Sequence, residues 1–151
     1  MTSDLARQLI DANAYMTLAT ADREGRPWAS PVWFAHEGYT TFYWVSRPGT
    51  RHSVNLEARP QLAIVIFDST VPEGEGQAVY MEAEAEPVPI EEQAGAMEVF
   101  SRRSVQRGGE AWTVADVNEP APHRLYRATA SSHFLLDAHD QRVPVNPAAA
   151  A

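Results

Sequence analysis

The sequence predicts a mainly β protein, a small antiparallel barrel with few helices. Segments rich in β-branched and aromatic residues follow one another at short intervals and are separated by Gly, Pro and Asp turns. This order is typical of strands joined as hairpins. The chain of 151 residues has the length of one domain, and its 44% hydrophobic and 21% charged residues are usual for a globular protein with a sizeable core.

The first third of the chain predicts one short helix and three strands. Ser3 is a suitable N-cap for a helix that ends at Asn13. The strands are expected at residues 15–21, 27–36 and 39–46, with turns at 22–25 and 37–38. Pro31 has no N–H to donate, so we expect a bulge or a sheet edge at its position.

The rest of the chain predicts further strands around two helices. Arg47-Pro48-Gly49 breaks the third strand, and Thr50 can cap a helix over 51–58. The later elements are strands at 62–68 and 77–87, a helix at 90–107, and one or two strands over 124–130 and 131–137. The segment 62–68 is almost entirely apolar, which is typical of a strand deep in a barrel. We expect a single domain over 1–143 and a frayed tail over 144–151.

Composition excludes several classes of function. The chain has no cysteine, which rules out a disulfide scaffold, a thiolate metal site and a cysteine nucleophile. Its formal net charge of −8 disfavours binding to a nucleic-acid backbone. The five histidines lack the short spacings of metal ligands, so we expect no metal site. Without a long apolar run or a signal-peptide pattern, the sequence predicts a cytoplasmic protein with no membrane partner.

The stretch SRPGTRHSVN, residues 46–55, is the most informative for function. It places Arg47, Thr50, Arg51 and His52 around the expected start of a helix. Free N–H groups and the helix dipole attract an anion there, and arginine binds phosphate with two hydrogen bonds. The stretch therefore indicates a phosphate site. The alternative is a loop that carries solvated arginines.

Two neighbouring strands are rich in aromatic residues. Alternation sends Phe42 and Trp44 to one face and Tyr43 to the other. Because both faces are then apolar, one fills the core and the other needs a cover. A helix, a partner chain or a flat ligand could supply that cover, and simple core packing is the alternative explanation.

Residues 15–68 resemble the pyridoxamine 5′-phosphate oxidase-like, FMN-binding split-barrel family. The resemblance lies in the segments YMTLATADREGRPWASPVWF, FYWVS and TRHSVNLEARPQLAIVIFD, and weaker likeness continues through Gln77 and RLYRATASSHFLL. It implies a six-stranded antiparallel split β-barrel of Greek-key topology. It also implies a homodimer that holds FMN at the interface between its subunits.

The resemblance also implies cofactor-binding residues. Thr50, Arg51 and His52 match a phosphate-binding Ser-Arg-Lys, with His52 in place of the lysine. Ser30, Val32 and Trp33 match a strand that lies along the flavin ring, and Tyr43 and Trp44 match a strand beside the ribityl chain. Asn55 matches a polar helix residue near the phosphate, and Gln77 matches a glutamine that hydrogen-bonds the cofactor.

These observations lead to one expected function and several alternatives. We expect an FMN-dependent oxidoreductase that acts on an unidentified small molecule. The same fold could use a deazaflavin coenzyme, and the family also includes haem-handling proteins. A non-enzymatic protein that binds flavin or another flat ligand is a further alternative, as is a barrel with a purely structural role. The Arg-rich C-terminal segment that holds pyridoxamine phosphate in the true oxidases has no match here, so we do not expect that substrate.

Overall fold

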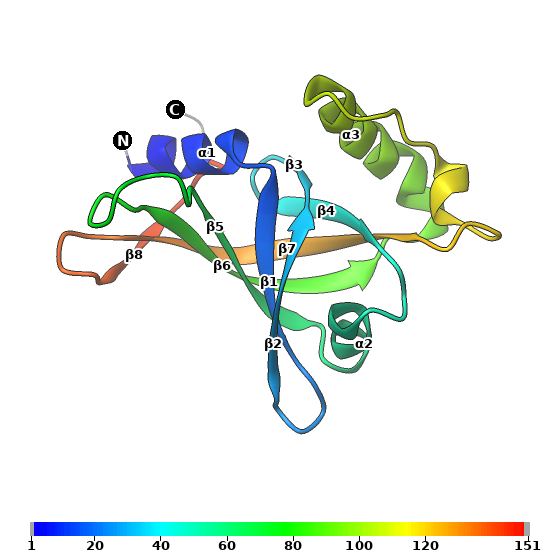
Figure 1. The fold of residues 1–151 in the computed structure, drawn as a ribbon, viewed down its shortest axis with the longest axis horizontal. Helices are drawn as coiled ribbons and strands as arrows, with labels where there is room; N and C mark the ends of the chain where they lie inside the picture. Colours follow the sequence, from blue (N-terminus) through cyan, green and yellow to red (C-terminus); the bar gives the residue numbers. More distant parts are fainter. Residues whose placement is uncertain (1, 150–151) are drawn as a thin grey trace.

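One antiparallel sheet of eight strands organises the structure, a computed structural model that describes residues 2–149 (Figure 1). Its strand order is β2-β1-β5-β6-β7-β4-β3, and β8 pairs with β7 beside this path. The strands are β1 (Tyr15–Ala21), β2 (Pro27–Trp33), β3 (Ala35–Glu37), β4 (Thr41–Ser46), β5 (Gln61–Phe67), β6 (Ala78–Pro87), β7 (Arg124–Leu136) and β8 (Arg142–Val145). The mainly β split barrel is confirmed, with eight strands among the described residues where six were expected.

The two edges of the sheet are joined by a single residue. β2 and β3 lie at opposite ends of the strand order, yet only Phe34 separates them in the chain. The Phe34 N–H donates to the carbonyl of Ala14 at 3.2 Å. The sheet is therefore curled into a barrel, and the strand expected at 27–36 is two strands that belong to opposite edges. Pro31 lies on an edge strand, as predicted.

The barrel interior holds the main hydrophobic core. α1 (Thr2–Ala12) contributes Ala6 and Ile10 to it, and α2 (Arg51–Ala58) contributes Leu56. The strands supply the large buried side chains Met16, Leu18, Phe42, Trp44, Ile64, Ile66, Val79 and Met81, and Phe34 joins them from the link between β2 and β3. The alternation predicted for residues 77–87 is confirmed, because the apolar side chains of β6 face this core while its glutamates are exposed.

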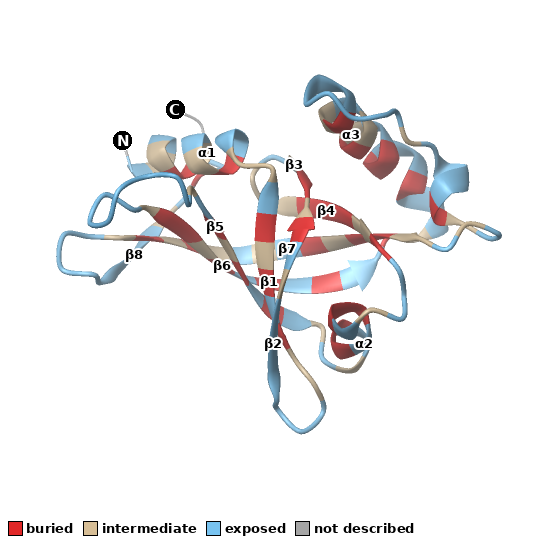
Figure 2. Cartoon of the chain, viewed as in Figure 1, coloured by how far each residue is buried: buried red, intermediate tan, exposed pale blue. Residues whose placement is uncertain are grey.

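A second core lies outside the barrel, under α3 (Gln93–Gln106), which follows the short helix η1 (Ile90–Glu92). α3 packs on β3 and β4, and its buried residues face the sheet (Figure 2). Tyr43 belongs to this second core, whereas Phe42 and Trp44 belong to the first. The predicted division of aromatic side chains between two faces is confirmed, and a helix covers the outer face at Tyr43.

One strand differs from expectation, and another resolves an alternative that the sequence left open. β5 alternates between buried and exposed positions, so its outward residues Ala63 and Phe67 are exposed. The prediction of a strand deep in the barrel was wrong on this face, because no element of residues 2–149 covers it. The last segment is a single strand, β7, whose pairing with β6 shifts register between Glu82 and Ala83.

Most of the expected C-terminal tail is held in place. Pro144 and Val145 belong to β8, which pairs with β7. Arg7 donates from Nη1 to the carbonyls of Pro147 at 2.8 Å and Ala149 at 3.1 Å. The tail is therefore bonded rather than frayed through Ala149, and residues 150–151 lie outside the described part. None of the helices within residues 2–149 is long and apolar enough to cross a membrane.

Candidate functional site

The turn between β4 and α2 forms the start of the candidate site. Thr50 caps α2 with extended backbone angles, and its hydroxyl accepts a hydrogen bond from the Ser53 N–H at 3.4 Å. The first two N–H groups of the helix, those of Arg51 and His52, have no acceptor among residues 2–149. Helix geometry leaves these groups free, and the helix dipole adds partial positive charge at the same place.

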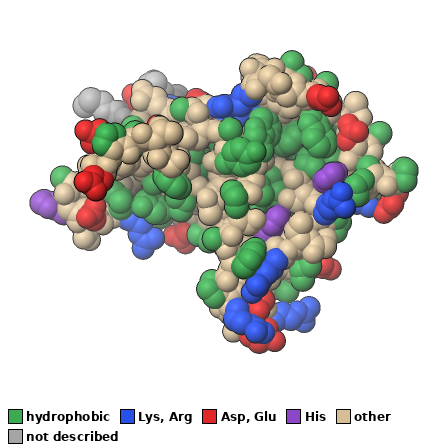
Figure 3. Space-filling view, viewed as in Figure 1, with side chains coloured by type: hydrophobic (Ala, Val, Ile, Leu, Met, Phe, Trp, Pro, Cys, Tyr) green, Lys and Arg blue, Asp and Glu red, His purple; other side chains and the backbone are tan. Residues whose placement is uncertain are grey.

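Two arginines flank this helix start. Arg51 is exposed, and its guanidinium carbon lies 4.4 Å from the centroid of the Trp28 ring on β2. Arg47 is exposed in the turn itself. Neither guanidinium has a carboxylate partner among the described residues, although ion pairs occupy several other arginines. At the lower end of the molecule in Figure 3, where α2 and the β1–β2 hairpin lie, arginine side chains are interspersed with acidic ones, and Arg26 of the hairpin pairs with Asp22 and Glu24. The turn, whose two arginines have no such partners among residues 2–149, is therefore a local excess of positive charge.

His52 lies beneath the turn and does not face solvent. Its side chain is buried, with Nε2 2.8 Å from Ser46 Oγ and 3.2 Å from Thr50 Oγ1. Burial lowers the pKa of His52 below its usual value, so the imidazole is neutral at pH 7. Where the resemblance implies a lysine charge, this chain has a neutral ring that orients Thr50.

Asn55 is also committed within the fold. Its Nδ2 donates to Thr20 Oγ1 on β1 at 3.0 Å, and both side chains are buried. The bond fixes the position of α2 on the sheet, and it therefore also fixes where the Thr50 turn lies relative to β1. The structure thus gives Asn55 a positioning role.

The candidate residues on β2 and β4 point in different directions. Val32 and Trp44 belong to the barrel core, and Trp44 stacks on Tyr126 with ring centroids 5.7 Å apart. Tyr43 lies under α3 and donates its hydroxyl to Glu37 Oε1 at 3.1 Å; burial raises its pKa to about 12. These three side chains are enclosed by the protein, so a ligand beside them would meet the backbone. Ser30 and Trp33 are half-buried.

Gln77 lies away from the turn. It precedes β6, whose first residue Ala78 pairs with Phe67 at the far end of β5, whereas α2 leads into the near end of β5 at Gln61. A strand of this length spans about 20 Å. Gln77 Oε1 is buried and has no hydrogen-bond partner among residues 2–149. The structure therefore does not bring Gln77 and the Thr50 turn together within one chain.

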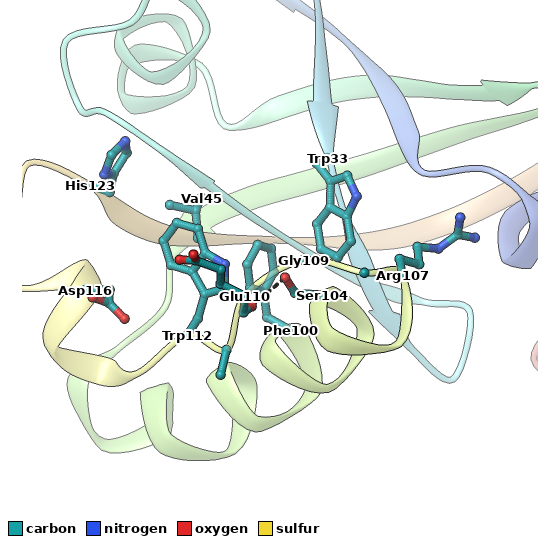
Figure 4. A pocket seen from close by; sticks show the side chains of 12 residues that line it. Trp33, Val45, Phe100, Ser104, Arg107, Gly109, Glu110, Trp112, Asp116 and His123 are labelled. Carbon is teal, nitrogen blue, oxygen red and sulfur yellow. Dashed lines mark hydrogen bonds between the residues drawn. The ribbon is translucent and has the colours of Figure 1, made fainter.

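A cavity of about 660 Å³ opens on the outer side of β2 and β4, under α3 and the segment that follows it (Figure 4). Three aromatic residues line it in a row of edge-to-face pairs. The ring centroids of Trp33 and Phe100 are 5.2 Å apart, and those of Phe100 and Trp112 are 5.7 Å apart. His123 continues the row at 6.4 Å from Trp112.

Sequence reasoning identified only Trp33 among these cavity residues. Trp112 and His123 come from the connection between α3 and β7, for which the sequence predicted neither a helix nor a strand. A tryptophan and a histidine in a connecting segment are the signal that could have drawn attention, because loops carry many functional residues. Phe100 gave no such signal, since an aromatic residue on a helix is usually core.

The fold and the Thr50 turn define a split-barrel protein with a candidate anion site beside an aromatic cavity. The sequence model described as pyridoxamine 5′-phosphate oxidase matches residues 2–136. The chain therefore belongs to the pyridoxamine 5′-phosphate oxidase family. No curated protein sequence matches it.

Solved structures share this fold at low sequence identity. A heme binding protein from Mycobacterium smegmatis superposes with a TM-score of 0.74 at 17% identity, over 97% of this chain and 58% of its own. HutZ, a heme storage protein from Vibrio cholerae, gives 0.67 at 21% identity, over 85% and 89% of the two chains. An FAD-binding protein from Mesorhizobium loti superposes with a TM-score of 0.67 at 19% identity, over 89% of this chain and 94% of its own. The chain thus spans less than two thirds of the length of the Mycobacterium protein.

Proposed function

We propose that this protein binds FMN and is a flavin-dependent oxidoreductase. The observation that carries the proposal is the turn at Thr50, where two exposed arginines without carboxylate partners flank two free helix N–H groups. A phosphate monoester matches this combination of charge and donors. Membership of the family supports the choice of a flavin, as does the fold shared with the FAD-binding protein from Mesorhizobium loti.

The residues present fit the rest of the cofactor. β2 is an edge strand, so it presents unpaired N–H and C=O groups along Ser30–Trp33 to a flat polar ring. Trp33 adds a half-buried aromatic surface. Bound FMN would supply hydride or electron transfer, while the chain supplies phosphate binding, ring orientation and shelter from water.

A second copy of the chain is part of the proposal. The outward face of β1 and β5 carries Tyr15, 60% exposed, and Phe67, 48% exposed, with no covering helix among residues 2–149. Exposed aromatic residues side by side are typical of a protein interface. Gln77 lies next to Phe67, so a homodimer through this face would bring its unpartnered Oε1 to the boundary between subunits. Phe67→Glu should convert the dimer to a monomer in sedimentation equilibrium.

The test of cofactor binding is an absorbance spectrum after incubation with FMN and gel filtration. A flavin spectrum at one FMN per chain supports the proposal. Arg51→Ala should weaken FMN binding about tenfold, close to 1.4 kcal/mol. Arg102→Ala is the matched control, because Arg102 lies on α3 and pairs with Glu98. Unchanged FMN affinity in Arg51→Ala contradicts the phosphate assignment.

A deazaflavin coenzyme would present phosphate and a flat ring to the same residues. Competition separates the two cofactors. If the deazaflavin coenzyme displaces FMN at an equal concentration and the reverse exchange fails, the protein is a deazaflavin-dependent reductase. If FMN binds tightly but no reduced nicotinamide donor is oxidised, the protein is a flavin carrier.

Haem binding is the second candidate function. His123 is half-buried in the wall of an aromatic cavity, and its ring nitrogens have no hydrogen-bond partner among residues 2–149. Such an imidazole can ligate iron. The names of the Mycobacterium and Vibrio proteins support this candidate. Titration with haemin would give a sharp Soret band that His123→Gln abolishes; an unshifted, broad absorption rules it out.

A further inference from the structure

The cavity under α3 has a wall built for a flat ring. Trp33 and Phe100 meet at an interplanar angle of 78°, and Phe100 and Trp112 at 89°. Phe100 is buried between the two half-buried indoles and meets each of them edge to face (Figure 4). Aromatic ligands gain from both offset-stacked and edge-to-face contacts, which a saturated ring of equal size cannot make in full.

The polar groups of the cavity are few and lie around this wall. Ser104 Oγ donates to the Glu110 carbonyl at 2.7 Å, and Asp116 accepts the capping hydrogen bonds of Thr113, so both are already engaged. His123 is the half-buried polar side chain that retains unbonded ring nitrogens within the described residues. A ligand hydroxyl or ring nitrogen therefore finds a half-buried hydrogen-bond partner at the His123 end of this cavity.

Charge around the cavity disfavours an anionic ligand. The carboxylates of Glu110 and Asp116 outnumber the single guanidinium of Arg107, which itself donates to the carbonyl of Asp11. The chain as a whole has a formal charge of −8. An anion would approach against this field, whereas an uncharged molecule would not.

The cavity also adjoins the strands proposed for the cofactor. Trp33 ends β2, and Val45 on β4 lies one residue before Ser46, where the Thr50 turn begins. A molecule held in the cavity would therefore lie beside a flavin ring placed along β2.

We propose that this cavity is the substrate pocket and that its ligand is an uncharged, planar aromatic molecule of one or two fused rings. Its hydroxyl or ring nitrogen hydrogen-bonds His123, and its ring packs against Trp33 and Trp112. The role as substrate pocket rests on the proposed flavin function, whereas the preference for flat, uncharged rings comes from the cavity alone.

The test is isothermal titration calorimetry of the full chain with three probes of similar size. These are 2-naphthol, the anion 2-naphthoate, and the saturated decahydro-2-naphthol. We expect 2-naphthol to bind about tenfold more tightly than either of the other two. Equal affinity for the saturated probe overturns the proposal, because the aromatic wall would then have no part in recognition.

Variants place the binding in this cavity. Trp112→Leu should weaken 2-naphthol binding about tenfold, and Trp112→Phe should restore most of it. Ala111→Trp fills the cavity from an exposed position and should abolish binding without altering either core. His123→Gln should weaken 2-naphthol binding, and His139→Gln, in the β7–β8 turn, is its matched control. Unchanged binding in Ala111→Trp overturns the assignment.

Repeating the titration with FMN separates this proposal from the function on which it rests. If the protein retains FMN but none of the probes binds, the substrate pocket is wrong and the flavoprotein proposal stands. If 2-naphthol binds and FMN is not retained, the flavin function is wrong and the cavity remains a site for aromatic molecules.

Discussion

The guanidinium carbon of Arg51 lies over the indole of Trp28, 4.4 Å from the ring centroid. The first residue of α2 is thereby tied to the edge strand β2. An exposed cation–π pair contributes about 0.5–1 kcal/mol and restricts a long side chain that would otherwise sample many rotamers. We therefore expect Trp28→Leu to release Arg51 and to raise the dissociation constant of FMN two- to fivefold. A tenfold change in this constant corresponds to about 1.4 kcal/mol. Fluorescence titration of FMN measures this constant.

A double-mutant cycle checks the origin of that loss. If Trp28 acts through Arg51, Trp28→Leu should have little further effect in the Arg51→Ala background. Fully additive losses would show that Trp28 contacts the ligand independently.

The hydrogen bond between Asn55 and Thr20 should carry measurable stability. Asn55→Ala leaves the buried Thr20 hydroxyl without its donor, and we expect the free energy of unfolding to fall by about 1–3 kcal/mol in urea titrations. The double variant with Thr20→Val should lose less than the sum of the single losses, because it removes both polar partners. A loss below about 0.5 kcal/mol in Asn55→Ala would contradict a positioning role.

Arg103 on α3 caps the end of α1 from a distance. One Nη donates to the carbonyls of Ile10 at 3.2 Å and Asn13 at 2.9 Å, while the guanidinium carbon lies 4.8 Å from the centroid of Phe34. Arg103→Met keeps the apolar stem but removes these bonds, so we expect a loss of about 2 kcal/mol in the free energy of unfolding. The neighbouring Arg102→Met should cost under about 0.5 kcal/mol, because its ion pair with Glu98 is exposed. Equal losses would rule out the capping role.

Stability should decline in mild acid. Burial lowers the pKa of His36, His52 and His133 below the ordinary value of 6.5. Between that value and the folded pKa, the unfolded chain binds protons that the folded chain does not, so stability is complete above pH 6.5 and falls as the pH decreases. The Tm from circular dichroism should therefore drop between pH 7.5 and 5.5, and His52→Gln should flatten this slope. A Tm that is constant over this range would contradict the prediction.

Local patterns predicted most of the secondary structure. In β6, strict alternation assigned each side chain to the correct face, since the barrel buries one side of that strand only. The division between Phe42 and Tyr43 followed from the same rule. No sequence pattern predicted the break after Trp33, because a chain that passes from one sheet edge to the other through one residue needs no turn sequence. The exposed face of β5 was missed because apolar composition alone does not show which surface is covered.

The site was predictable where it is local in sequence. Thr50 as a cap and the arginines around it follow from one short stretch of chain. The burial of His52 depends on Ser46 and on how α2 rests against β1, which spacing does not show. The aromatic cavity depends on α3 docking against β4, so Trp33 and Trp112, far apart in sequence, share a wall only after the chain folds.

The link through Phe34 joins the two edges of the sheet covalently at one point. β2 and β3 cannot separate at that residue, whereas the Trp28 end of β2 has no such link to the opposite edge. Trp33 is next to Phe34, and Trp28 contacts Arg51 near the other end of β2. The aromatic side of the candidate site is therefore anchored by the chain itself, whereas its charged side is held by non-covalent contacts, the Arg51–Trp28 pair and the bond between Asn55 and Thr20.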